Sequence, residues 1–352
     1  MNETTFEIEV QDDHVETISQ TRKPILALSE LLWNAVDADA ERVDVTIEHD
    51  DLGGIRAIEV SDDGHGMPRT EAPAVFGKLG GSWKRARRYT KGKKRLLHGQ
   101  EGKGRLRSFS LGRVVDWTVR YNSGDELREY TISIIKDEPR RGNVSPETSA
   151  QPPLRSGTTV RITEVHGNFR SLQAEEAPEQ IAVIFALYLR QYPSVRIFYN
   201  GAIIDPRAVE DRSEVKPLPD IETADGKTYP CELEIVEWKI NTARRLFLCN
   251  AGGFPIDEAA PGIQAPGFQF TAYLKSDYFA ELLAENAIGL ADMDPAVDAA
   301  LTSAKAAMRD HFRTRAEEQA RGLVEQWKEE KIYPFASEPG TEVERKERQV
   351  FD

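Results

Sequence analysis

The stretch Asp62-Asp63-Gly64-His65-Gly66-Met67 is the most informative turn in this chain. It follows residues 55–61, whose alternating apolar and polar side chains are typical of a β-strand. The two glycines permit a tight turn and let the backbone approach a flat ring without a Cβ in the way. A carboxylate at Asp62 can then accept a hydrogen bond from the exocyclic amine of adenine. An ordinary Asp-Gly turn is the alternative, although this stretch is more elaborate than a turn requires.

A helix is predicted over residues 24–39, because Pro24 suits a first turn and apolar residues recur at helical spacing. Glu30 and Asn34 are four residues apart and therefore share one face, with Asp37 three residues further along it. A carboxylate at Glu30 can deprotonate an attacking water as a general base, and the Asn34 amide oxygen can ligate magnesium. The alternative is a solvated polar face on an amphipathic helix.

A third segment, Gly99-Gln100-Glu101-Gly102-Lys103-Gly104-Arg105, precedes another apolar run. Its glycines free backbone amides to cradle phosphate groups at the start of a helix, where the helix dipole also favours anions. The segment is not a Walker A loop, because no Gly-Lys-Ser/Thr ends it. It is not a Rossmann fingerprint either, because no βαβ unit surrounds it.

These three segments, followed by Gly157-Thr158, resemble the GHKL ATPase superfamily of gyrase, heat-shock chaperones, sensor histidine kinases and MutL. The third segment is most similar to the chaperone and MORC versions. The resemblance implies ATP and Mg²⁺ as ligands, Glu30 as catalytic base, Asn34 as metal ligand and Asp62 as adenine reader. It implies further ATP contacts at Asn34, Asp37, Gly64, Gly66, Met67, Gly99, Gln100, Glu101, Gly102, Lys103, Gly104, Arg105 and Thr158. An ordinary strand start is the alternative at Thr158, and Asp63 stands where the family usually has Asn.

The resemblance also implies an α+β fold in two domains. Residues 1–165 are expected to form a Bergerat-type ATP-binding α/β sandwich, which is a mixed sheet covered by helices. Residues 166–335 are expected to form a ribosomal-protein-like α/β transducer domain. Transducers of this branch often send a basic residue to the γ-phosphate, and Lys275 is the candidate for a catalytic role here, with a plain surface lysine as the alternative. The polar tail, residues 336–352, suggests a longer native protein.

The expected ATP lid, residues 77–105, contains a local concentration of positive charge. Residues 84–95 hold eight cations among twelve residues, in a chain whose net charge is −13. One interpretation is that these cations screen the triphosphate. A second is that they face outward and bind nucleic-acid phosphates. A third is a solvated loop without a ligand. The candidate DNA contacts are Lys84, Arg85, Arg87 and Arg88.

Composition narrows the class of protein further. With 352 residues and 39% hydrophobic content, the chain is long enough for two cores. The cysteines Cys231 and Cys249 form neither a disulfide framework nor a metal-ligand pattern. No apolar run approaches the ~20 residues of a membrane span, and the N-terminus lacks the shape of a signal peptide. We therefore expect a cytoplasmic protein without membrane contact.

Two functions remain open at this point. The first is an ATP-driven dimeric clamp on DNA, in genome maintenance or phage defence. The second is a chaperone-like ATPase that remodels a protein client, and a nucleotide-gated interaction module is a third possibility. The basic lid favours the first function, whereas the third segment and the overall acidity favour the second. Relatives join two ATPase domains when ATP binds, so we expect a homodimer in that state, with residues 5–10 as an exchanged edge strand.

Overall fold

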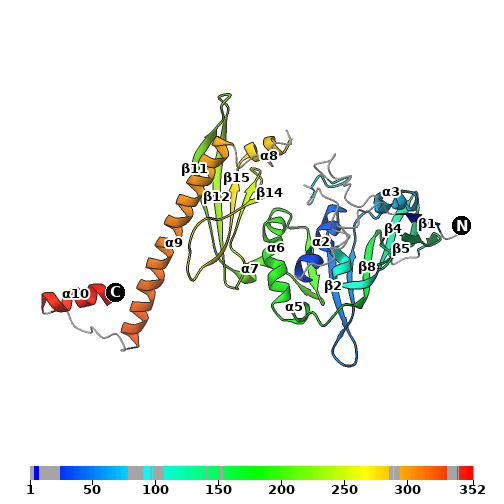
Figure 1. Ribbon diagram of the computed structural model, residues 1–352, viewed down its shortest axis with the longest axis horizontal. Coiled ribbons are helices and arrows are strands. Elements are labelled where there is room, and N and C mark those ends of the chain that lie inside the picture. Colours follow the sequence, from blue (N-terminus) through cyan, green and yellow to red (C-terminus); the bar gives the residue numbers. More distant parts are fainter. Residues whose placement is uncertain are drawn as a thin grey trace. The chain divides into compact units, whose positions relative to one another are not determined.

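The computed structural model describes residues 4–7, 24–77, 90–95, 97, 107–139, 141–150, 154–284, 288, 294–330, 339 and 341–351. The chain divides into two compact units, residues 1–209 and residues 210–352 (Figure 1). No helix in the described part combines the length and the apolar character that crossing a membrane requires.

The described residues of the first unit form a mixed, ten-stranded sheet with the order β1-β6-β5-β4-β8-β3-β2-β9-β10, and β7 pairs with β5. Its strands are β1 (Thr4–Glu7), β2 (Arg42–His49), β3 (Ile55–Asp62), β4 (Gly112–Ser123), β5 (Glu126–Ile135), β6 (Arg141–Val144), β7 (Thr148–Ser149), β8 (Gly157–Val165), β9 (Arg196–Tyr199) and β10 (Ala202–Ile203). Neighbouring strands are antiparallel except for β2 and β9, which run parallel. The consecutive strands β2 and β3, and likewise β4 and β5, pair as antiparallel hairpins.

Two long helices, α2 (Pro24–Asp37) and α6 (Ala177–Gln191), pack together in the first unit. The Trp33 ring stacks on Phe185 with centroids 4.1 Å apart and meets Tyr188 edge-on. The shorter elements are η1 (Arg69–Glu71), α3 (Ala72–Gly77), η3 (Ser108–Ser110), α5 (Arg170–Gln173) and α7 (Pro206–Val209). A mixed sheet with helices packed on it is the ATP-binding sandwich that the sequence predicts.

The boundary between the units lies further along the chain than the sequence indicates. We expected a change of domain at residues 165–166, but residues 166–209 pack within the first unit. The reason is a long-range strand pair, since β9 lies parallel to β2 with Arg196 opposite Arg42 and Tyr199 opposite Val45. The helix α6, which leads into β9, packs on α2. The second unit therefore begins at Glu210.

The described residues of the second unit form a five-stranded sheet with the order β11-β12-β15-β13-β14. Its elements are β11 (Glu210–Glu222), β12 (Thr228–Trp238), β13 (Arg245–Cys249), β14 (Pro255–Ala259), β15 (Gln269–Lys275), α8 (Asp277–Ala284), α9 (Pro295–Glu329) and α10 (Glu342–Phe351). Its core joins the sheet to α8 and α9 through large side chains such as Phe270, Phe279, Met308 and Phe312. The α/β composition agrees with the expectation, and the relation to a ribosomal-protein-like transducer stays a prediction.

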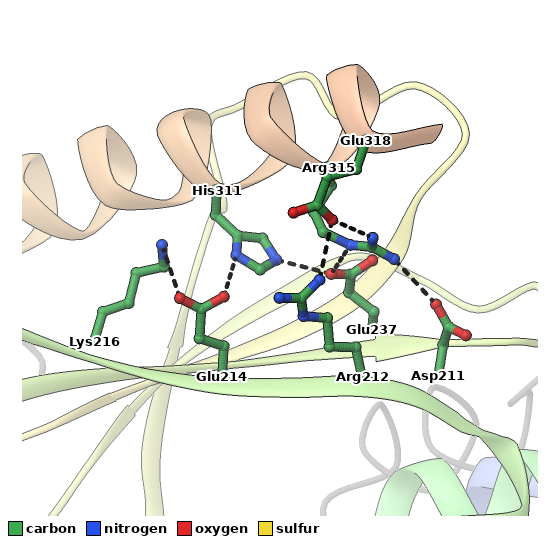
Figure 2. Close-up of polar contacts among 8 residues, drawn as sticks. All are labelled: Asp211, Arg212, Glu214, Lys216, Glu237, His311, Arg315 and Glu318. Carbon is green, nitrogen blue, oxygen red and sulfur yellow. Dashed lines mark hydrogen bonds and ion pairs between the residues drawn. The ribbon is translucent and has the colours of Figure 1, made fainter. Parts of the chain in front are cut away.

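A charged cluster also fastens α9 to β11 and β12 (Figure 2). His311 is buried, and its two ring nitrogens lie 3.1 Å from Glu214 Oε2 and 2.8 Å from Glu237 Oε1. The Arg315 guanidinium donates to the same Glu237 oxygen at 2.9 Å. We call this cluster the α9 network; its members are Asp211, Arg212, Glu214, Lys216, Glu237, His311, Arg315 and Glu318. A doubly protonated imidazole would donate to both glutamates at once.

Candidate nucleotide-binding site

Asp62 ends strand β3 and faces two backbone donors from different parts of the chain. The amides of Gly64 and Thr158 both donate to Asp62 Oδ1, at 2.8 Å and 3.1 Å. Thr158 lies on β8, which pairs with β3. The sheet itself therefore brings the predicted Gly157-Thr158 motif beside the turn that begins at Asp62. Loss of water around the carboxylate raises the pKa of Asp62 to about 7, despite the two hydrogen bonds and the positive charge of Arg120, and the neighbouring charge of Asp63 adds to the rise.

Glycines let the backbone close tightly around Asp62. Gly66 has a φ of +62°, and a Cβ at this position would lie 2.0 Å from the Arg120 carbonyl oxygen. Gly157 has a φ of +146°, and its Cβ would lie 1.9 Å from the Asp62 carbonyl oxygen. A Cβ on Gly64 would likewise meet the Ala38 carbonyl oxygen at 2.6 Å. Side chains at these positions would force the strand ends apart, so the backbone itself lines the space beside Asp62.

Met67 follows this turn with its side chain partly exposed. Its carbonyl oxygen accepts a hydrogen bond at 3.0 Å from the hydroxyl of Tyr130, a buried residue of β5. The contact fixes the end of the turn against the sheet. We name residues 62–67 the adenine loop, in keeping with the role predicted for it.

Glu30 and Asn34 are the partly exposed positions in the middle of a helix that is otherwise mostly buried. Asp37, predicted to contact ATP, is buried at the end of the same helix. The amide oxygen of Asn34 suits a magnesium ion that keeps most of its ligands as water and phosphate oxygens. No group of three His, Cys, Asp or Glu side chains that could hold a metal occurs among the residues described.

Glu30 has a partner that sequence reasoning missed. The Arg107 guanidinium donates through Nη1 to Glu30 Oε1, and the two residues are 77 positions apart in the chain. Arg107 immediately precedes η3, which packs on α2. The structure thus brings the chain just after the third motif beside the predicted catalytic base. A basic residue two positions beyond the glycine segment was the available signal.

The remaining predicted residues fall into two groups. Gly99, Gln100, Glu101, Gly102, Lys103, Gly104 and Arg105 lie outside the described residues, as do Lys84, Arg85, Arg87 and Arg88. Lys275 ends β15 in the second unit, and its ammonium group lies 2.8 Å from Glu234 and 3.2 Å from Glu232. Burial acts to lower the pKa of Lys275, but these two carboxylates raise it above its ordinary value. A catalytic role at Lys275 stays a prediction, and it would require Lys275 to exchange these partners for a phosphate.

The first unit has a mixed sheet with packed helices and a strand-end aspartate that the backbone holds. One of its helices bears a carboxylate and an amide. These features are those expected of an ATP-binding domain of the GHKL type. Residues 23–159 match the model of the family described as "Histidine kinase-, DNA gyrase B-, and HSP90-like ATPase". Residues 23–159 are thus an ATPase domain of the GHKL superfamily, in its GHL branch.

Curated relatives support this assignment. The chain is 31% identical over 153 residues to the DNA mismatch repair protein MutL of Halobacterium salinarum, across 41% of this chain and 20% of that protein. It is 55% identical over 54 residues to MutL of Acidiphilium cryptum, across 15% of this chain and 9% of that protein. It is 28% identical over 158 residues to a subunit of the type 2 DNA topoisomerase 6 of Natronomonas pharaonis, across 44% of this chain and 19% of that subunit. The matches thus span a fifth or less of each relative's length.

Proposed function

We propose that the first unit binds ATP with Mg²⁺ and hydrolyses it, and that the chain works as a nucleotide-gated dimeric clamp on DNA. The observation that carries the proposal is the environment of Asp62. Its Oδ1 is taken by the Gly64 and Thr158 amides, so Oδ2 is the oxygen that would accept the adenine amine. A ligand that donates a hydrogen bond there would offset the cost of keeping this carboxylate away from water.

Hydrolysis is supported by the position of Glu30. Its carboxylate lies on the same helix face as Asn34, one turn away, which is the arrangement needed to activate a water beside a metal-bound phosphate. Magnesium held through Asn34 would neutralise phosphate charge. Arg107 holds the Glu30 side chain in place, and a triphosphate would compete with Glu30 for that guanidinium.

DNA as the substrate is supported by the similarity to a DNA mismatch repair protein and to a DNA topoisomerase subunit. This similarity favours the clamp over the chaperone-like alternative. With a net charge of −13, the whole protein would repel DNA, so contact would need a local basic surface such as Lys84, Arg85, Arg87 and Arg88. Genome maintenance or phage defence would be the setting of such a clamp, which would form a homodimer on ATP binding.

The first test uses Glu30→Ala in the full chain. We expect this variant to bind ATP and magnesium nearly as well as the unaltered protein but to hydrolyse ATP slower by ~10²–10⁴, the usual loss for a general base. Unchanged turnover, or loss of ATP binding, would remove Glu30 from this role.

The second test separates the clamp from the alternative. Duplex DNA should raise the ATPase rate, and the effect should fade as salt rises, because phosphate contacts release counterions. Light scattering of Glu30→Ala with ATP should show a dimer that is absent, or weaker, without nucleotide. An ATPase rate indifferent to DNA at all salt concentrations would favour the chaperone-like function, and an unchanged mass would argue against any clamp.

A further inference from the structure

The connection between α2 and β2, residues 38–42, is held by two different parts of the chain. We call it the α2–β2 turn. It links the helix that bears Glu30 and Asn34 to the sheet. One of its partners is the adenine loop, and the other is residues 90–95, which belong to the predicted lid. Neither partner is close to the turn in sequence.

Asp63 fastens the adenine loop to this turn. Its Oδ1 accepts hydrogen bonds from the amides of Glu41 at 2.7 Å and Arg42 at 2.8 Å. Its own amide donates to the Arg42 carbonyl at 3.2 Å, and the His65 amide donates to the Ala38 carbonyl at 3.0 Å. Four hydrogen bonds therefore set the position of the adenine loop relative to the end of α2.

Asp39 fastens residues 90–95 to the other side of the turn. It is buried, with a φ of +66°. Its Oδ2 accepts from the Gly92 amide at 2.7 Å and its Oδ1 accepts from the Lys93 amide at 3.1 Å. Burial acts to raise the pKa of Asp39, but the hydroxyl of Thr90 and these two amides lower it below its ordinary value. Asp39 is thus an ionised acceptor that uses both of its oxygens.

Residues 90–95 are themselves closed into a compact loop. The Thr90 amide donates to the Arg95 carbonyl at 2.8 Å, and the Arg95 amide donates to Thr90 Oγ1 at 3.0 Å. The Arg95 side chain is 3% exposed, and its Nη1 donates to the Ala40 carbonyl at 2.5 Å. Lys93 also pairs with Glu41 at 2.5 Å. The described end of the basic run is thus engaged with the α2–β2 turn.

Residues 90–95 are the described part of the basic run in the predicted lid, and they carry Lys91, Lys93, Lys94 and Arg95. One interpretation of these cations is that they screen the triphosphate. Adenine and triphosphate are two ends of one ligand, so a turn that holds both the adenine loop and residues 90–95 bears on both ends.

We propose that Asp39 is a positioning residue for nucleotide binding, which holds residues 90–95 in a fixed place relative to the adenine loop through the α2–β2 turn. The inference rests on the proposed ATP binding and goes beyond it, because Asp39 would act through the turn and not through a contact with the nucleotide. The alternative is that Asp39 serves only to end helix α2, and the two roles predict different results for one substitution. Glycine is the residue best suited to a positive φ, so Asp39→Gly would preserve the turn while removing the anchor.

The experiment compares Asp39→Gly and Asp39→Asn with Asp44→Asn in the full-length chain. Asp44 is a matched control, because it is an aspartate nearby whose partner is the exposed side chain of Arg42. We expect Asp39→Gly to weaken ATP binding roughly tenfold, the factor associated with losing hydrogen bonds to a charged group. Asp39→Asn should have a smaller effect, since one acceptor oxygen remains, and it serves as the second variant should the first fold poorly.

Two further measurements separate anchoring from a general loss of structure. KM for ATP should rise in Asp39→Gly while kcat stays within about threefold, because Glu30 is untouched. The amides of Gly92 and Lys93 should exchange with deuterium faster, while the amides of β3 keep their protection. ATP affinity and exchange equal to those of the unaltered protein would overturn the inference.

The same experiment distinguishes failure of the inference from failure of the proposed function. If the unaltered protein binds no ATP, the proposed function falls and the inference falls with it. If ATP binds and Asp62→Asn weakens that binding, but Asp39→Gly binds ATP normally, only the inference is overturned.

Discussion

Each of the two units surrounds a carboxylate with protein groups that shift its pKa, and the two shifts have opposite signs. Glu237 of the second unit is 3% exposed, and burial acts to raise its pKa, yet hydrogen bonds from His311 and Arg315 lower it below the ordinary value. Asp62 of the first unit has two backbone donors, and the loss of water around it raises its pKa to about 7. The difference lies in the partners, because Glu237 faces cations whereas Asp62 faces amides and the like charge of Asp63.

We interpret this contrast as one between a structural ion pair and the proposed ligand site at Asp62. In the α9 network (Figure 2) each of the four carboxylates has a partner among three fixed cations and His311. By contrast, the folded protein disfavours the ionised form of the Asp62 side chain. Perturbed carboxylates of this kind are found where a ligand or a reaction supplies the missing partner. The predictions below test this contrast.

The largest effect is expected from Glu237→Leu. The substitution roughly conserves volume but leaves His311 and Arg315 without their shared acceptor, which typically costs about 3–5 kcal/mol for a buried pair. Hydrogen exchange in β12 should report the loss of stability. The same change at Glu318, whose side chain is 45% exposed, should leave exchange in β12 nearly unchanged, because solvent screens the pair. Equal effects at the two positions would mean that burial does not set the strength of this network.

The next effect is a dependence of stability on pH with opposite signs in the two units. The folded pKa of Asp62 is above its unfolded value, so its contribution is full below about pH 4 and is lost as the pH rises through about 7. The contribution of Asp62 to the free energy of unfolding is at most about 2–4 kcal/mol, because its side chain is only partly buried and solvent screens its charge. Glu237 has a lowered pKa, so its contribution is present above about pH 4.5 and is lost as the pH falls further.

Denaturant unfolding of the unaltered protein and Asp62→Asn at pH 5, 6, 7 and 8 measures this difference. The amide cannot ionise, so Asp62→Asn should become the more stable protein as the pH rises, and the gain should appear in the first unit. A constant difference between the two proteins across this range would show that Asp62 ionises as an ordinary exposed aspartate.

The same Asp62→Asn protein should lose affinity for ATP. An asparagine can keep the Gly64 and Thr158 amides on its oxygen, which turns its NH₂ group toward the adenine amine. Two facing donors should weaken ATP binding by about 1–3 kcal/mol, or roughly tenfold to hundredfold. Calorimetric titration with ATP and magnesium measures this loss of affinity, with Asp44→Asn as the control. Unchanged affinity would place adenine elsewhere.

The smallest effect is expected from Asp63→Asn. Both amides that Asp63 accepts share Oδ1, so asparagine can keep the geometry while the charge beside Asp62 disappears. The pKa of Asp62 should fall, and the pH midpoint of ATP binding should move down by about half a unit or less. A shift upward would mean that Asp63 does not act on Asp62 through its charge.

The sequence predicted those parts of the site that depend on local geometry. Asp62, Gly64 and Gly66 form a turn at a strand end, and Glu30 and Asn34 share a helix face, because both features follow from spacing along the chain. The family match to residues 23–159 agrees with the predicted ATPase fold, and the roles of these residues stay predictions.

What the sequence did not reveal depends on contacts between distant residues. Arg107 meets Glu30 across 77 positions, and Asp39 meets Gly92 across 53. The unit boundary moved from residue 165 to residue 209 because β9 pairs with β2. These contacts form only once the sheet and helices have assembled. The spacing of residues within each segment therefore does not predict them.

The helix α9 is long compared with the part of it that packs in the core of the second unit. It has 35 residues, and its core contacts end at Phe312, with Arg315 and Glu318 completing the α9 network just beyond. The following residues, 319–329, are mostly exposed, and α9 runs on past its sheet (Figure 1). At ~1.5 Å per residue the portion beyond Phe312 is about 25 Å long. A tilt of about 5° where α9 packs on the sheet would therefore move the end of the helix by about 2 Å. The helix is in effect a lever arm with its pivot at His311, and a spectroscopic label near Glu325 would magnify small movements of that pivot.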